Sequence, residues 1–204
     1  MPADLFESAY LGTPPWDIGR AQPAIMRLAG TGQITGLVLD IGCGTGENVL
    51  YLAEHGFVAA GIDGAPTAIR KARAKAKRRG LQARFELADA LDLAVPEQLF
   101  DTVIDSGLFH VFSDEDRAHF RDSLGRVVRL GGTYFLMCFS DEEPGDWGPR
   151  RVTQAEIRSV FSDGWRVNYI QPSAFETNLG QSYAWLASIS RWLAATAARV
   201  ARDP

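Results

Sequence analysis

The sequence has few cysteines and no long hydrophobic run, and its first residues do not resemble a secretory leader. Two cysteines among 204 residues cannot form a disulfide framework, which favours a reducing compartment. No apolar stretch reaches the roughly 20 residues that a membrane-spanning helix needs. The first residues also lack the basic and apolar regions of a signal peptide. We therefore predict a cytoplasmic protein that has no membrane partner.

Positive charge is not in excess either. The 21 Lys and Arg residues are outnumbered by 25 Asp and Glu, and the net charge of −4 argues against a general nucleic-acid binder. One basic segment, 66–79, is predicted to be a helix with Pro66 in its first turn and Gly80 after its last. A nucleic-acid patch is one interpretation. We favour a solvated outer helix, because no aromatic residues interleave its charges.

Several familiar catalytic motifs are absent as well. No G-K-[ST] follows the glycine-rich stretch at 42–46, which excludes a P-loop, and no G-x-S-x-G is present. The three histidines do not combine with acids or cysteines at the spacing of metal ligands. We expect no bound metal.

What the sequence does contain is a predicted buried strand that runs into alternate glycines. Residues 38–41 are apolar apart from Asp40, and a helical pattern begins at Glu47. Glycine lets a backbone turn tightly and approach a ligand, and a helix N-terminus presents free N–H groups. The pattern predicts a nucleotide-type binding loop made by Gly42, Cys43, Gly44 and Gly46. The alternative is a tight turn that binds nothing.

Two acidic residues narrow the choice of ligand. The glycine spacing differs from the G-x-G-x-x-G that cradles a pyrophosphate. Asp40, just before the loop, suits a ligand that carries an ammonium group rather than a phosphate. Asp63 ends the next predicted strand about 20 residues further on, where an acid can bind ribose hydroxyls. S-adenosylmethionine has both of these features.

The glycine loop, Asp40 and Asp63 together resemble the cofactor motif of class I S-adenosylmethionine-dependent methyltransferases. The resemblance implies a Rossmann-like α/β fold with a seven-stranded, mostly parallel sheet, helices on both faces and an antiparallel last strand. It implies S-adenosyl-L-methionine as cofactor. It also implies one domain, 1–204, divided into an N-terminal flap and helix (1–30), a cofactor-binding half (36–140) and an acceptor-side half (141–204).

Further cofactor candidates follow from strand ends. By the resemblance, Asp89 lies near the adenine amino group, although an Asp that only caps a loop is an alternative. Ligands of parallel sheets sit beyond the carboxyl ends of strands. The candidates at these ends, besides Asp63, are Gly64, Asp89, Ala90, Asp105 and Ser106.

The segment Pro-Pro-Trp-Asp-Ile-Gly-Arg at 14–20 forbids a regular helix or a central strand. It resembles the N-terminal signature of a small-molecule group of the family, which includes thiopurine- and halide-type methyltransferases and enzymes that methylate hydroxyquinolone toxins. The resemblance implies that this segment lies over the cofactor and makes Trp16 and Arg20 binding candidates. The alternative is a surface loop whose Trp16 only covers the edge of the core.

Aromatic residues gather in segments that could wall an acceptor pocket, and an aromatic wall suits a flat heteroaromatic molecule. The acceptor-binding candidates are Tyr10, Trp16, Phe109, His110 and Trp147. The polar, proline-rich segment 140–149 could act as a lid.

We also expect particular element boundaries. Ser113 resembles an N-cap, and the helix that it opens is predicted to end at 131–132. Residues 153–156 have capping-box spacing. Residues 175–181 are predicted to be a loop, and a terminal helix is expected over 192–204.

These residues predict methylation of a small heteroaromatic molecule. We favour O-methylation of a hydroxyl in detoxification, as the resemblance to the hydroxyquinolone enzymes implies. His110 is then the candidate general base, since an unperturbed histidine has a pKa of about 6.5. The alternative is a loop histidine that only packs. Methylation of a thiol, halide or tellurite is the second hypothesis, and a nucleotide-binding sensor without chemistry is the third.

Overall fold

The computed structural model describes residues 3–94 and 98–192. Its centre is a seven-stranded sheet with the order β3-β2-β1-β4-β5-β7-β6. Only β7 runs antiparallel to its neighbours β5 and β6. The predicted sheet and its antiparallel last strand are therefore confirmed. The strands are β1 (Leu37–Ile41), β2 (Val58–Asp63), β3 (Arg84–Leu87), β4 (Phe100–Ser106), β5 (Val128–Phe139), β6 (Trp165–Thr177) and β7 (Gly180–Arg191).

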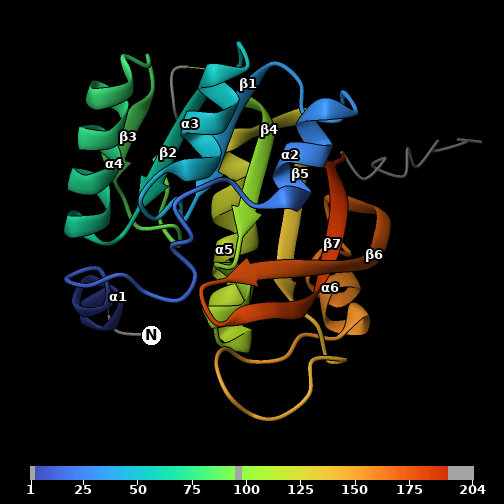
Figure 1. Cartoon of the computed structure of the whole chain (residues 1–204). Coiled ribbons are helices and arrows are strands. Elements are labelled where there is room, and N and C mark those ends of the chain that lie inside the picture. The colour runs from blue at the N-terminus through green and yellow to red at the C-terminus, as the bar shows by residue number, and fades with distance from the viewer. Residues whose placement is uncertain (1–2, 95–97, 193–204) are drawn as a thin grey trace, which may run out of the picture.

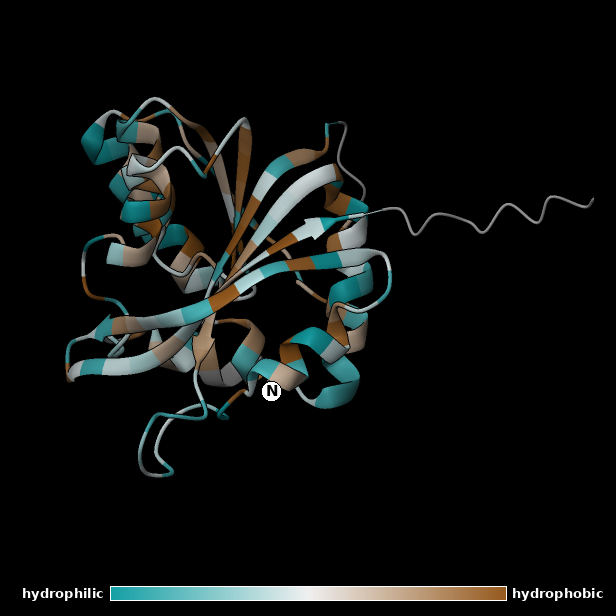
Figure 2. Ribbon diagram, turned by 90° about the vertical axis from the view of Figure 1, so that its right-hand side faces the viewer, coloured by the Kyte–Doolittle hydropathy of each residue, from teal (hydrophilic) through white to brown (hydrophobic). Residues whose placement is uncertain are grey.

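Helices cover both faces of the sheet (Figure 1). One hydrophobic core lies between the sheet and α2, α3 and α4, and a second lies between the sheet and α5 and α6. Figure 2 shows that hydrophobic residues concentrate on the central strands. The helices are α1 (Ala3–Ala9), α2 (Pro23–Gly30), α3 (Glu47–Glu54), α4 (Pro66–Arg79), α5 (Asp114–Val127) and α6 (Gln154–Val160), with a short 3-10 helix, η1 (Phe109–Val111).

Local signals fix several helix ends as predicted. Pro66 begins α4, and Gly80 ends it in the left-handed conformation with φ of 66°. Ser113 and Asp116 form a capping box at the start of α5, and Thr153 and Glu156 form another at α6.

Two predicted boundaries are wrong. Helix α5 ends at Val127 rather than at 131–132, because Val128 already pairs with Phe100 in the sheet. Residues 175–181 are not a loop, since β6 continues to Thr177 and β7 begins at Gly180. Pairing between the two strands of this hairpin extends them beyond what their own pattern indicates. The predicted terminal helix lies outside the described residues except for Trp192, which is not helical.

Within residues 3–94 and 98–192, no helix is both long enough and apolar enough to cross a membrane. In the same residues, no cluster of three His, Cys, Asp or Glu side chains is placed to hold a metal ion. Both cysteines are buried and free.

Candidate active site

The loop between β1 and α3 makes a tight turn at the sheet's carboxyl edge. Gly42, Gly44 and Gly46 all have positive φ, at 72°, 54° and 85°. A Cβ on Gly46 would lie 2.6 Å from the ring of Phe85, and one on Gly44 would lie 2.7 Å from the Tyr10 hydroxyl. The loop therefore needs glycine both for its conformation and for its close packing.

Asp40 lies buried beneath this loop at the end of β1. Its side chain is 1% exposed, and its Oδ2 accepts a long hydrogen bond of 3.4 Å from Asn48 Nδ2. Within the described ranges, its Oδ1 has no hydrogen-bond partner. Burial, together with the charge of Asp105, raises the pKa of this carboxyl well above its usual range. A buried acceptor without a partner suits a bound cation such as an ammonium group.

Asp63 shapes the same loop from the end of β2. Its Oδ2 accepts the N–H of Gly44 and its Oδ1 accepts the N–H of Ala65, each at 2.8 Å. Burial raises the pKa of this carboxyl. The side chain is half-buried, and each oxygen has a further lone pair for a ligand hydroxyl. Gly64, next in the chain, is exposed.

Candidates from β3 and β4 lie at the same edge. Asp89 is exposed, and its Oδ1 accepts the N–H of Leu91 at 2.9 Å, so it caps its own loop as one interpretation predicted. Ala90 and Ser106 are half-buried.

Asp105, a predicted cofactor contact, has partners within the protein for both of its carboxylate oxygens. Its side chain is fully buried. It accepts the backbone N–H groups of Leu108 and Phe109 at 2.7 and 3.1 Å and the Tyr134 hydroxyl at 2.8 Å. Burial raises the pKa of this carboxyl to about 7. Asp105 therefore holds the turn after β4 and presents no surface to a ligand.

Phe109 likewise faces the interior of the protein. It was predicted to line an acceptor pocket, but its side chain is fully buried in the core beneath α5. It packs on Phe120 and Phe161, and the guanidinium of Arg117 lies 4.6 Å from its ring centre. The sequence indicates that Phe109 lies at the carboxyl edge of the sheet. It does not indicate whether the side chain faces a pocket or the core.

The segment from Tyr10 to Arg20 lies across the glycine loop. The Tyr10 hydroxyl accepts a hydrogen bond of 3.0 Å from Trp16 Nε1 and lies close to Gly44. Asp17 Oδ1 accepts the hydroxyl of Thr45 at 2.7 Å. Tyr10 is therefore buried on the cofactor side of the edge rather than beside His110, while Trp16 is 46% exposed.

The same segment and Gln22, which follows it, are also joined to the tip of the β6–β7 hairpin. Gln22 Nε2 donates to the carbonyl of Glu176 at 2.8 Å, and the N–H of Glu176 donates back to Gln22 Oε1 at 3.0 Å. Arg20, a predicted cofactor contact, forms an ion pair with the Glu176 carboxylate. The N–H of Asn178 donates to the carbonyl of Pro15 at 2.8 Å. No local signal in the sequence indicates these long-range contacts.

His110 lies beyond the ends of β4 and β5 and is 6% exposed. Its Nδ1 accepts the backbone N–H of Phe139 at 3.1 Å, so the neutral ring carries its proton on Nε2. Burial, and then the charges of Arg117 and Arg151, lowers the pKa of His110 to about 3. The ring faces Phe139 and Phe175 at centroid distances of 5.1 and 5.9 Å. This environment opposes the predicted general base and leaves Nε2–H as a hydrogen-bond donor.

Arg151 organises the loop after β5, although no pattern in the sequence indicates this role. Its guanidinium lies 5.3 Å from the ring centre of Phe139 and 5.7 Å from that of Trp147. The guanidinium donates hydrogen bonds to a ring of backbone carbonyls, which belong to Glu143, Pro144, Gly145, Trp147 and Pro149. The predicted lid segment therefore has a defined shape, and Trp147 lies at its outer end, 47% exposed.

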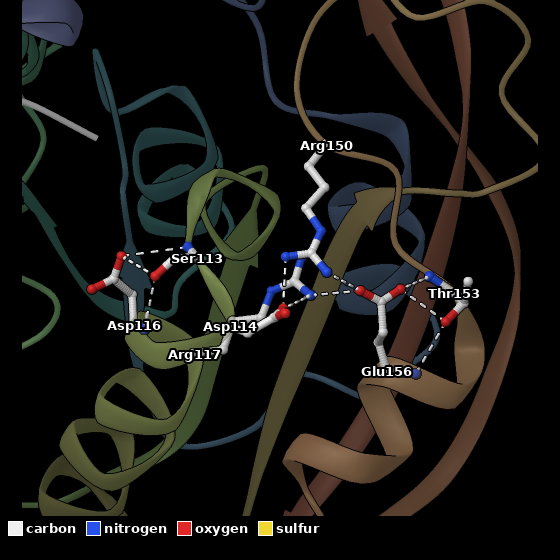
Figure 3. A network of polar contacts seen from close by, with 7 residues as sticks. All are labelled: Ser113, Asp114, Asp116, Arg117, Arg150, Thr153 and Glu156. Carbon is white, nitrogen blue, oxygen red and sulfur yellow. Dashed lines mark hydrogen bonds and ion pairs between the residues drawn. The ribbon is translucent and has the colours of Figure 1, made fainter.

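A polar network fixes the base of this loop (Figure 3). Arg150 bridges Asp114 and Glu156, at 2.6 and 2.5 Å, and so joins the loop to the first turns of α5 and α6. Glu156 also accepts a hydrogen bond of 3.0 Å from the buried Arg117. The loop after β5 is thus anchored to α5 and α6, the two helices on the same face of the sheet.

Comparison with known proteins identifies this combination of fold and loop. Residues 38–132 match the family described as "Methyltransferase domain". The magnesium protoporphyrin IX methyltransferase of Synechocystis PCC 6803, solved with bound S-adenosylmethionine, has the same fold, with a TM-score of 0.65 at 22% identity over 82% of this chain and 76% of that one.

Two proteins are more similar. The 2-heptyl-1-hydroxyquinolin-4(1H)-one methyltransferase of Mycobacteroides abscessus is 39% identical over 86% of this chain and 82% of its own length. A structure solved in work on the conversion of a disulfide bond into a thioacetal group during echinomycin biosynthesis is 38% identical, with a TM-score of 0.87 over 94% of this chain and 93% of that one. The chain belongs to the S-adenosylmethionine-dependent methyltransferases, and S-adenosyl-L-methionine is its cofactor.

Proposed function

We propose that this enzyme transfers a methyl group to the hydroxyl oxygen of a small heteroaromatic molecule of the hydroxyquinolone type. The observation that carries the proposal is the aromatic cluster around His110, in a chain that is 39% identical to a hydroxyquinolone methyltransferase. Phe139 and Phe175, which are 5% and 6% exposed, would supply flat apolar walls to an acceptor that enters this cluster, and Nε2 of His110 would supply one polar contact. This combination suits a planar ring with an oxygen substituent.

The cofactor has a set of contacts that fit its chemistry. Asp40 Oδ1 is a buried acceptor for the ammonium group, the glycine loop leaves room for close backbone approach, and Asp63 retains acceptor capacity for ribose hydroxyls. When bound, S-adenosylmethionine supplies a methyl group that is already activated for displacement. The chain's own contribution is then to orient the acceptor, which can lower a barrier by roughly 7–11 kcal/mol.

In this proposal His110 donates a hydrogen bond instead of removing a proton. Each pKa unit by which a hydroxyl exceeds the working pH costs about 1.36 kcal/mol to ionise. A hydroxyl on the ring nitrogen of a quinolone ionises more readily than a phenol, because its negative charge is shared with the ring carbonyl. Nε2–H of His110 can stabilise that anion and hold it in place, so no base is required.

Methylation of sulfur is the second candidate, since the structure that is 38% identical comes from work on sulfur chemistry. The same apolar walls would suit a thiolate. We place the oxygen acceptor first because the hydrogen-bond donor at His110 serves an oxygen anion better than the softer sulfur. Within a cell, O-methylation of a toxic hydroxyquinolone would be a detoxification step, and we expect it to take place in the cytoplasm. We also propose that residues 1–204 act as one methyltransferase domain.

The test is a competition assay with equal concentrations of a hydroxyquinolone, an aromatic thiol, a heteroaromatic ring nitrogen and iodide. Mass spectrometry of the products gives kcat/KM for each acceptor. The proposal predicts that the hydroxyquinolone is preferred. Preference for the thiol would move the assignment to the second candidate, and cofactor binding without any transfer would favour a sensor.

A further inference from the structure

A surface hollow of about 220 Å³ lies between the outer end of the Arg151-organised loop and the tip of the β6–β7 hairpin. Its lining consists of Trp147, Thr177, Leu179, Gly180, Gln181 and Ser182. None of these residues takes part in the cofactor contacts described above. The hollow therefore needs a separate explanation.

The rim of the hollow is unusually apolar for an exposed site. Leu179 is 77% exposed and Trp147 is 47% exposed, and Tyr183, next to Ser182, is 58% exposed. Large apolar side chains that gather at one exposed place usually mark a binding surface. No cationic side chain is among these lining residues, so a phosphate or carboxylate ligand would have no opposite charge there.

Two contacts link residues of the hollow to the aromatic cluster around His110. Trp147 packs edge-on against Phe139 at 5.7 Å, and Phe139 faces His110. Ser182 pairs across the hairpin with Phe175, which also faces His110. A ring bound against Phe139 and Phe175 would therefore have the hollow beside it, next to Trp147 and Ser182.

We propose that this hollow binds an aliphatic tail on the acceptor, so that the enzyme selects ring systems that carry a straight alkyl chain. The inference rests on the proposed function and specifies its substrate class. A methylene group is close in size to a water molecule, whose share of the liquid volume is about 30 Å³. The hollow thus has room for roughly seven carbons, and the heptyl group in the name of the M. abscessus relative is of that length.

The energetics give the proposal a measurable form. Full burial of one methylene group changes an equilibrium by about fourfold at 25 °C. Because the hollow is open to solvent on one side, we expect kcat/KM to rise about two- to fourfold with each added methylene. The rise should stop when the tail is longer than the hollow, at about seven carbons.

The experiment measures kcat/KM for 1-hydroxyquinolin-4(1H)-ones with 2-methyl, 2-propyl, 2-pentyl, 2-heptyl and 2-nonyl substituents. The wild type is compared with Leu179→Asn and with a matched control, Leu130→Asn. Leu130 is an exposed leucine at the opposite end of the sheet, 46% exposed. For Leu179→Asn we expect about a tenfold loss with the heptyl acceptor and less than a twofold loss with the methyl acceptor. Leu130→Asn should retain the wild-type dependence on chain length.

The outcomes separate this proposal from the proposed function. If all the quinolones are methylated with the same kcat/KM, the hollow does not bind the alkyl tail, and the proposed O-methylation still stands. Equal losses for the methyl and heptyl acceptors in Leu179→Asn would also overturn the proposed tail binding, because the hairpin would then support the ring or the fold. Transfer to no member would remove the proposed function and this inference together.

Discussion

The two sides of the candidate active site are built in different ways. The cofactor side is centred on one strand, turn and helix, β1 to α3, in which neighbouring residues determine the backbone, and Asp63 joins it from the end of β2. The acceptor side brings together η1, the loop after β5 and the β6–β7 hairpin, which are far apart in the sequence. Local sequence therefore specifies the first side, and long-range packing specifies the second.

This difference has a consequence for function. A cofactor site centred on one short segment can be kept while the acceptor walls change, because the two share few contacts. The segment from Tyr10 to Arg20 is the exception, since it touches Thr45 on one side and the hairpin on the other. The following variants test whether the two sides are energetically separate.

Asp40→Asn should have the largest effect. Removing one partner of a buried charge pair costs about 2–5 kcal/mol, so the Kd for S-adenosylmethionine should rise at least thirtyfold. The unliganded protein should be as stable as the wild type or more stable, because a buried carboxyl without a full set of partners is removed. Calorimetric titration and thermal unfolding measure the two quantities. A Kd within threefold of the wild type would contradict the role of Asp40.

Arg151→Lys should affect the acceptor side alone. Lysine retains the charge but cannot hold the same ring of carbonyls. We expect the KM for the acceptor to rise about tenfold, from a loss of roughly 1.4 kcal/mol, with the Kd for the cofactor within twofold. Arg150→Lys, at the neighbouring position, is the control and should change KM less than threefold, since Arg150 is substantially exposed. A similar rise in both variants would mean that the loop needs only the positive charge.

The pH dependence of His110 gives the third test. Because the pKa of His110 is lowered to about 3, the ring stays neutral as the pH falls from 8 to 5. The wild-type kcat/KM for an oxygen acceptor should therefore show no decline near pH 6.5 that depends on His110. Its pH profile should have the same shape as that of His110→Gln. His110→Gln keeps a donor and should lose only about three- to tenfold. A decline near pH 6.5 in the wild type that is absent from the variant would restore the general base.

Glu176→Gln should have the smallest effect. The ion pair between Arg20 and Glu176 is partly exposed, and such pairs contribute about 0–1 kcal/mol. The hydrogen bonds between the Gln22 side chain and the Glu176 backbone remain in this variant. We expect the Kd for the cofactor and the KM for the acceptor to change less than threefold in parallel titrations. A change above tenfold in either would show that this contact couples the two sides.

The same contrast explains what the sequence could predict. The glycine loop, Asp40 and the two capping boxes are recognisable because each depends on residues within a few positions. Asp105 and Phe109 were placed at the correct edge, but their burial depends on Tyr134, Phe120 and other residues that fold against them from elsewhere.

The acceptor side could be predicted only in outline. Residues 175–181 look like a loop because their strand character comes from pairing within the hairpin. In the sequence Arg151 cannot be distinguished from a surface arginine, because the carbonyls that it binds come together only in the folded loop. The low pKa of His110 depends on complete burial, which its own neighbours in the sequence do not indicate.

The most direct measurement locates the transferred methyl group. The enzyme is incubated with 2-heptyl-1-hydroxyquinolin-4(1H)-one and S-adenosylmethionine labelled with carbon-13 in its methyl group, and the product is analysed by NMR. The account predicts a labelled methyl group bonded to oxygen. A methyl group on carbon, or no product while an aromatic thiol is methylated under the same conditions, would contradict it.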